Sequence, residues 1–355
     1  MEVINDKDIY KIKNIYFNKI DLPIVYIFDS NIVVDIGKLY YKPTSLDIES
    51  KYALLNLINY IREEGIEYDA KYALTELSTD RVNGGVIEEK YRRLQSGLNK
   101  IMNMPLKKLR KHVLYSNRVI SNNNSFVDFP ENPDMANIIK NTLMALNYAY
   151  VILAKFFILL NLYGERNKEK IYSELLEFAH YEIKAISLYE FSAIIFYLFS
   201  SDDEFTNSQN LMKVNKKLEL VKKVFNISWD LTYLRYINEL TGRYLSKEIE
   251  DIDCKNYVLV TKDKALAKIS ELLICDSNSE IDGKFVPNII IDCDKIKEKY
   301  RDVYEEYYYK YNSDEVRNSR IQMLKNMDSI DHMNKLDKLT NQLTLELLNM
   351  DKAKP

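Results

Sequence analysis

Short apolar runs that each lead into a helical segment are the feature that most limits the fold of this chain. The first run, "PIVYIFDSN" (residues 23–31), is mostly apolar and then ends on Asp29. Similar runs occur at "YVLV" (257–260) and "NIII" (288–291), and each precedes a polar turn and a helical pattern. Apolar strands alternating with helices indicate a parallel sheet with helices on its faces. We therefore expect an α/β fold.

A long helical region divides this α/β pattern. Before this region, a helix ends at Gly65, and a very short strand and a second helix that bears Glu76 follow it. After it, the pattern resumes with a strand at Val224–Ile227, whose helix begins near Ser228. We expect four parts: the α/β domain's first half (1–84), a helical insertion (85–222) with polar breaks at 121–134 and 200–210, the α/β domain's second half (223–299) and a helical C-terminal extension (300–355).

Composition excludes several classes of protein. The 50 Lys and Arg nearly balance the 53 Asp and Glu, so a globally basic nucleic-acid binder is not indicated. Three scattered Cys and three His without ligand spacing argue against a disulfide framework and a zinc site. The N-terminus has no hydrophobic signal core, and the apolar stretch Ala145–Gly164 contains Lys155, which favours a buried helix over a membrane span. We expect a soluble, cytoplasmic protein.

Four acids lie beside the ends of predicted strands. Asp29 directly follows an apolar run and Asp263 lies just past the end of another, while Glu76 and Asp230 lie on the helices that come next. Ligands of parallel α/β sheets bind at the carboxyl ends of the strands, so these carboxylates could converge there. Crowded carboxylates need a cation, and Mg²⁺ or Mn²⁺ prefers oxygen ligands. The alternative for any one of these acids is a turn or helix-capping role. Asp80, one helical turn after Glu76, is a reserve candidate.

The set of acids resembles the PIN domain, a family of metal-dependent nucleases. "IVYIFDSNIVVDI" is similar to the family's first strand with its acid, "YDAKYALTELSTD" to its second strand and helix, and "SWDLTYLRYINEL" with "YVLVTKDKALAKI" to its last pair. The resemblance implies that Asp29 and Asp263 bind the metal directly and that Glu76 and Asp230 complete the site. It implies that Asn31 holds Asp29 and that Thr261 bonds a ligand carboxylate or phosphate. The long helical insertion departs from compact members of the family.

Local basic clusters suggest a nucleic-acid surface, although a solvated helix face explains them equally well. The resemblance alone favours RNA over DNA as substrate, and toxin, phage-defence and RNA-processing roles stay open. An inactive scaffold that binds nucleic acid or protein is the alternative, and a third reading makes the helical parts the functional body. The leucine spacing near the C-terminus also suggests oligomerisation or a protein partner through the helical parts. The basic residues concerned are Lys107, Lys108, Arg110, Lys111, Lys222 and Lys223.

Overall fold

The computed structural model describes most of the chain and divides it into two compact units. Unit 1 consists of Met1–Ile139, Tyr236–Glu271 and Ser277–Asn288, and unit 2 of Lys140–Arg235, Leu272–Asp276 and Ile289–Pro355. The structure describes residues 1–13, 22–80, 85–115, 135–200, 202–214, 218–242, 255–281, 284–325 and 329–353.

Within the described part of unit 1, five strands form one mixed sheet in the order β1-β2-β5-β3-β4. The predicted parallel arrangement holds for β3, β4 and β5, because β3 pairs in parallel with both others. It is wrong for the rest of the sheet, since β2 pairs antiparallel with β5 and with β1. The strands are β1 (Glu2–Asp6), β2 (Ile9–Lys13), β3 (Ile24–Phe28), β4 (Glu67–Asp69) and β5 (Asn256–Thr261).

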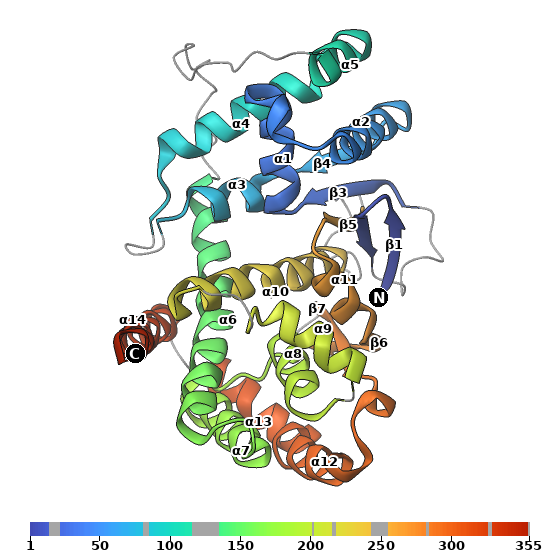
Figure 1. Ribbon diagram of the computed structural model, residues 1–355. Coiled ribbons are helices and arrows are strands. Elements are labelled where there is room, and N and C mark those ends of the chain that lie inside the picture. Colours follow the sequence, from blue (N-terminus) through green and yellow to red (C-terminus); the bar gives the residue numbers. More distant parts are fainter. Residues whose placement is uncertain are drawn as a thin grey trace. The chain divides into compact units, whose positions relative to one another are not determined.

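Helices follow each parallel strand, as the sequence predicts (Figure 1). The Asp47 carboxylate caps α2 by accepting the Ser50 amide at 2.7 Å, and Gly65 after its end adopts a positive φ of 63°. The short helix α11 packs against β1 and β2. The helices after the parallel strands are α1 (Ser30–Tyr41), α2 (Ile48–Glu63), α3 (Lys71–Ser78) and α11 (Lys264–Glu271).

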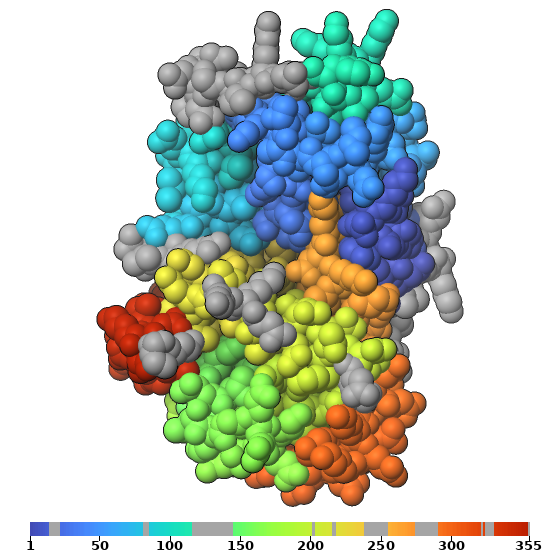
Figure 2. All heavy atoms as spheres, in the orientation of Figure 1, coloured from blue at the N-terminus to red at the C-terminus, as the bar shows by residue number. Residues whose placement is uncertain are grey.

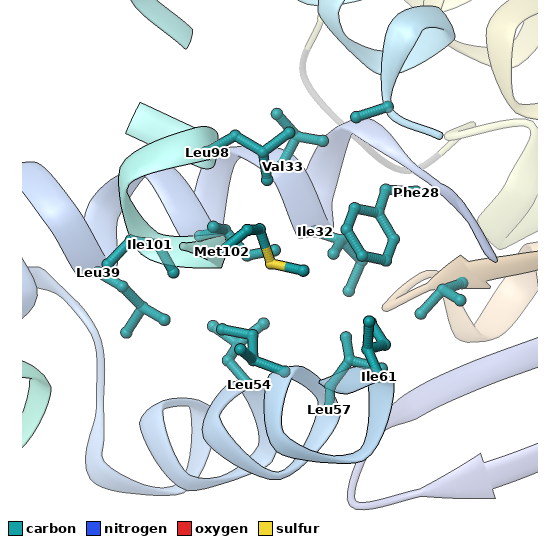
Figure 3. Close-up of a cluster of buried hydrophobic side chains, with 14 of the residues drawn as sticks. Phe28, Ile32, Val33, Leu39, Leu54, Leu57, Ile61, Leu98, Ile101 and Met102 are labelled. Carbon is teal, nitrogen blue, oxygen red and sulfur yellow. The ribbon is translucent and has the colours of Figure 1, made fainter. Parts of the chain in front are cut away.

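One apolar core joins the sheet to α1, α2 and α3 (Figure 3). Tyr26 and Phe28 of β3 enter this core, while the intervening Ile27 is buried on the other face, as strand alternation requires. Each fully buried aliphatic side chain contributes about 1.5–3 kcal/mol relative to exposure. Figure 3 shows the side chains that gather in this core with Phe28: Ile32, Val33, Leu39, Leu54, Leu57, Ile61, Leu98, Ile101 and Met102.

Two helices predicted as part of the insertion belong to this core. They are α4 (Glu88–Met102) and α5 (Leu106–Tyr115), which bring Leu98 and Leu109 into it. Gly97 allows α4 to approach α1, because an added Cβ would lie 2.7 Å from the Tyr41 ring. Unit 1 therefore extends beyond the boundary that we predicted at residue 84.

Arg62 of α2 stabilises the end of α4. Its guanidinium donates hydrogen bonds of 2.6–2.8 Å to the carbonyls of Ile101, Met102 and Met104. Carbonyls at a helix C-terminus have no partner within the helix, so Arg62 satisfies groups that burial would otherwise penalise. This contact ties α4 to α2 by polar bonds in addition to apolar packing.

Unit 2 is helical, with two differences from the sequence prediction. The strand predicted at Val224–Ile227 is wrong, because these residues lie inside the continuous helix α10. The polar break predicted at 200–210 is largely a helix, α9. The helices are α6 (Met135–Tyr163), α7 (Lys168–Glu177), the π-helix Phe178–Ile183, α8 (Leu188–Phe199), α9 (Asp202–Leu211), α10 (Leu220–Gly242), α12 (Glu298–Asn312), α13 (Asp314–Lys325) and α14 (Ser329–Ala353); α6 and α10 extend into unit 1.

The predicted strand Asn288–Ile291 exists but lies outside the five-stranded sheet. It forms the end of β7 (Lys284–Ile291), which pairs with β6 (Leu273–Ile281) in a separate two-stranded sheet. The apolar run was therefore recognised correctly, but its partner was not. The predicted polar break at 121–134 lies outside the described residues.

The apolar helices of unit 2 are used inside the unit. Leu336, Leu343 and Leu347 of α14 are at most 3% exposed, so the spacing that suggested an oligomer is satisfied within the chain itself. Within the described residues, one helix, Ala145–Tyr163, is long and apolar enough to cross a membrane, and 56% of its apolar window is buried. A single helix of this kind also occurs in protein cores, so it does not indicate a membrane protein.

Candidate functional site

Asp29 lies where β3 ends and α1 begins. Its amide donates to the Val260 carbonyl at 3.0 Å, which extends the β3–β5 pairing by one bond. Its carboxylate accepts the Ser30 amide at 2.5 Å and so caps α1, and the residue is only 1% exposed. The capping role was the alternative considered for a single acid after a strand, and the structure shows that Asp29 fills it.

Asn31 and Thr261 hold the second oxygen of the Asp29 carboxylate. The amide group of Asn31 and the hydroxyl of Thr261 each donate to Asp29 Oδ2 at 2.5 Å. The Asn31 amide also lies 3.0 Å from Thr261 Oγ1, and its carbonyl accepts the Lys262 amide at 2.9 Å. Asp29 thus accepts more donors than a helix cap needs, and they come from two different segments of the chain. The structure brings these three predicted residues together.

Asp263 reaches the same cluster through Thr261. Its amide donates to Thr261 Oγ1 at 2.9 Å, so one hydroxyl joins the Asp29 carboxylate to the Asp263 backbone. Its carboxylate accepts the Leu266 amide at 2.9 Å and caps α11. Asp263 is half-buried. The two acids therefore end adjacent parallel strands, as the sequence predicts.

Tyr10 of β2 lies across from Thr261 in the sheet, and the charges of nearby acids affect the pKa of its hydroxyl. Burial, followed by the negative charge of Asp8, raises the pKa of the Tyr10 hydroxyl. The charge of Asp263 raises this pKa further, while Lys268 opposes the shift.

Glu76 belongs to the same unit, but it is not among the residues that the bonds above connect to Asp29. It is half-buried on α3, the helix that follows β4. Asp80 does not lie one helical turn beyond it, because α3 ends at Ser78 and Thr79 has an extended backbone. The interpretation of Asp80 as a helical neighbour of Glu76 is therefore wrong.

Asp230 is assigned to unit 2 and has a cationic partner there. It lies in the middle of α10, is 8% exposed, and accepts a 2.5 Å hydrogen bond from the ammonium of Lys213. A carboxylate paired with a buried lysine already has the counter-charge that burial demands. The predicted position at the end of a strand is incorrect, because α10 replaces that strand.

The donor types available in unit 1 fit a hard divalent cation. Asp29 and Asp263 offer carboxylate oxygens, which Mg²⁺ and Mn²⁺ prefer. In the part of the chain that the structure describes, no three His, Cys, Asp or Glu side chains form a group that could hold a metal. Mg²⁺ is often bound by one or two carboxylates, with waters and substrate phosphates as its other ligands. The chemistry of the two acids fits that type of site.

The predicted basic residues fall into two groups. Those on α5 are all exposed, and none forms an ion pair with another described residue; Figure 2 shows α5 on the surface of unit 1. Lys222 instead pairs with Glu219 at 2.9 Å. Lys223 is only 7% exposed and lies 3.4 Å from the Val214 carbonyl, so the prediction that it contacts nucleic acid is wrong. The α5 cations are Lys107, Lys108, Arg110 and Lys111.

Sequence reasoning missed two charged groups near the strand ends. Asp69 ends β4, accepts the Lys71 amide at 2.8 Å and pairs with the Lys71 ammonium at 2.8 Å. Lys262, between Thr261 and Asp263, reaches the buried carboxylate of Asp35 at 2.9 Å. Asp69 shows the same sequence pattern as Asp29, an acid at the end of a strand, so it could have been predicted from the sequence. The ion pair between Lys262 and Asp35 depends on tertiary structure.

Comparisons of the chain with family models, curated proteins and solved structures found no match.

Proposed function

We propose that the chain is a nuclease that depends on Mg²⁺ or Mn²⁺ and hydrolyses phosphodiester bonds, with Asp29 and Asp263 at its centre. The observation that carries this proposal is the Thr261 hydroxyl, which bonds both the Asp29 carboxylate and the backbone amide of Asp263 at the ends of adjacent parallel strands. Ligands of such sheets bind at that edge. RNA is preferred over DNA because of the resemblance to PIN domains, and a cytoplasmic toxin or phage-defence effector is the biological role that we propose.

The chain's own residues would orient the acids. Asn31 and Thr261 fix the direction of the Asp29 carboxylate, since both donate to its Oδ2. The cap on α11 fixes Asp263 in the same way. A divalent ion bound there would activate water and stabilise the charge that develops at phosphorus. Because hydrogen bonds already hold these carboxylates in place, their side chains need little rearrangement when the ion binds. Glu76, on α3 of the same unit, is the further acid that we propose to aid the site.

A scaffold that binds nucleic acid or a protein without cutting it is the second candidate. Asp29 and Asp263 both cap helices, and this structural role accounts for both acids without any catalysis. The scaffold and the nuclease differ in a simple readout. A scaffold retains a partner when either acid is replaced by Asn and needs no metal ion for binding.

The decisive experiment uses Asp263→Asn, because Asn also caps helices and the substitution leaves the fold intact. The purified chain is incubated with labelled single-stranded RNA and DNA in Mn²⁺, Mg²⁺ or EDTA. We expect metal-dependent cleavage that falls about a hundredfold or more in this variant. The matched control is Asp47→Asn, which changes the same residue type at the cap of α2 and should cleave normally. Cleavage that persists in EDTA, or equally in Asp263→Asn, would contradict the proposal.

A further inference from the structure

A pocket of about 740 Å³ lies in unit 1 between the sheet and α2, and its walls combine apolar side chains with charged and amide groups. Ile9 and Val258 from the sheet and Leu57 from α2 are among the residues that line it. Small-molecule sites in proteins commonly have this size and combine apolar walls with a few polar groups. The pocket does not include any of the acids proposed for the nuclease site, so it is a separate feature.

Lys11 of β2 is the polar group that stands out in this pocket. Its ammonium lies 4.5 Å from the centre of the Tyr60 ring and 5.3 Å from that of Tyr26. No described carboxylate lies within the 4.0 Å of an ion pair. Burial lowers the pKa of this ammonium, and Asp6 partly offsets the shift, so Lys11 is a partly dehydrated cation. Such a cation gains free energy when an anion approaches it.

The other charged groups of the pocket are already paired or opposed. Lys13 lies on the same strand and pairs with Glu2 at 3.1 Å. Glu63 accepts a 2.7 Å hydrogen bond from the side-chain amide of Asn59. The negative charge of Asp6 raises the pKa of Lys11 and so favours its charged form. These two acids would repel a dianion such as a phosphate monoester more strongly than a ligand with one negative charge. A ligand with one negative charge matches the single cation that has no ion pair.

We propose that this pocket binds a small carboxylic acid with an apolar body, whose carboxylate contacts Lys11 between Tyr26 and Tyr60. The body lies against Ile9, Leu57 and Val258, which accounts for the apolar walls. The inference does not depend on nuclease activity, because it uses neither Asp29 nor Asp263. It gives the chain a second site, for a small molecule.

The test measures binding of three probes to the full chain by ligand-observed NMR and calorimetry: 3-phenylpropionate, its neutral amide and phenyl phosphate. We expect the carboxylate to bind at least about tenfold more tightly than the amide and the phosphate, a difference of about 1.4 kcal/mol. Lys11→Met keeps the apolar stem and removes the charge, and should abolish this preference. Absence of carboxylate binding up to about 10 mM, a free energy weaker than about 3 kcal/mol, would overturn the proposal.

Two further variants make the outcome specific to the pocket. Lys13→Met is the matched control, because it removes a neighbouring lysine that is already paired with Glu2. We expect it to keep the preference for the carboxylate; an equal loss in both lysine variants would contradict the role of Lys11. Asn56→Trp changes an exposed residue of α2 that lines the pocket and fills the space. It should weaken the carboxylate and the amide alike, and unchanged binding in this variant would show that the ligand lies elsewhere.

Discussion

The Thr261 hydroxyl donates a 2.5 Å hydrogen bond to the carboxylate of Asp29, although the two residues are 232 positions apart in the chain. Asp29 is 1% exposed and Thr261 is fully buried. A buried carboxylate that loses a donor retains its desolvation penalty, so this bond matters to the stability of unit 1 as well as to the proposed site.

Thr261→Val should destabilise unit 1 by about 1–3 kcal/mol, because it removes the hydroxyl that joins the two strand ends. Thr261→Ser keeps the hydroxyl and should retain most of the stability. Hydrogen exchange of the β3 and β5 amides, followed by mass spectrometry, measures the difference. Equal exchange rates in the Val and Ser variants would show that the hydroxyl contributes nothing.

Asp29→Asn and Asp263→Asn should differ in stability although both replace a helix cap. The carboxylate of Asp29 accepts hydrogen bonds from three donors, whereas Asn at this position would present an NH2 group that is itself a donor. We therefore expect the free energy of unfolding to fall by about 1–3 kcal/mol. At position 263 the substitution should stay within about 0.5 kcal/mol, since Asn caps as well as Asp. Urea denaturation followed by exchange of α1 and α11 amides compares them. A larger loss at position 263 would contradict this order.

The buried pair of Lys213 and Asp230 should behave as a structural ion pair of unit 2. Asp230→Asn leaves a buried ammonium without its charged partner, which typically costs about 3–5 kcal/mol. The double variant Lys213→Met with Asp230→Leu should lose less than Asp230→Asn alone. Trp229, the sole tryptophan of the chain, is buried in unit 2 and reports its unfolding by fluorescence. A normal denaturation midpoint in Asp230→Asn would contradict this structural role of the pair.

Unit 2 should lose stability as the pH falls below about 6.5, because two of its histidines resist protonation. Burial and then Arg320 lower the pKa of His180 from its ordinary value of 6.5, and burial with Lys335 and Lys184 lowers that of His332. The folded state therefore binds fewer protons than the unfolded state, so this stability is present above pH 6.5 and lost below it. Replacing both histidines by Asn should flatten the pH dependence of the free energy of unfolding of unit 2, measured by the fluorescence of Trp229.

The cations of α5 should govern the salt dependence of nucleic-acid binding if unit 1 contacts a phosphate backbone. Replacing all four by Gln should reduce the slope of log affinity against log salt by about 0.7 for each phosphate of a single strand that is no longer neutralised. Fluorescence anisotropy with labelled RNA at several salt concentrations measures the slope. The control replaces Lys338 and Lys352, exposed residues of α14, and should leave it unchanged. An unchanged slope in the α5 variant would place the binding surface elsewhere.

The parallel part of the sheet could be predicted because its strands are short apolar runs followed by helices. β2 was missed since "IYKIK" places Lys11 and Lys13 on the face that lines the pocket, which breaks the expected apolar pattern. The apolar run at Val224–Ile227 was misinterpreted because a four-residue run fits a buried helix as well as a strand. Only the surrounding residues of α10 decide between the two.

The candidate site shows a similar limit. Asp29, Asn31, Thr261 and Asp263 come together because each borders a strand end, which the sequence pattern reveals. Asp230 could not be assigned correctly from the sequence, since its partner Lys213 lies in the preceding turn, after α9, and no local pattern predicts that pair. The burial of Lys223 likewise depends on tertiary packing.

The order of strands has a consequence for how the chain is made. β5 lies between β2 and β3, yet it is encoded after residue 255, so it is the last of the five strands to leave the ribosome. Until β5 is made, β2 and β3 both lack the neighbour that lies between them, so an edge of each has no partner strand. Contacts between distant segments form slowly. Because the helical insertion is synthesised between them, Asp29 leaves the ribosome well before its partner Thr261. The proposed site cannot form until Thr261 has been made.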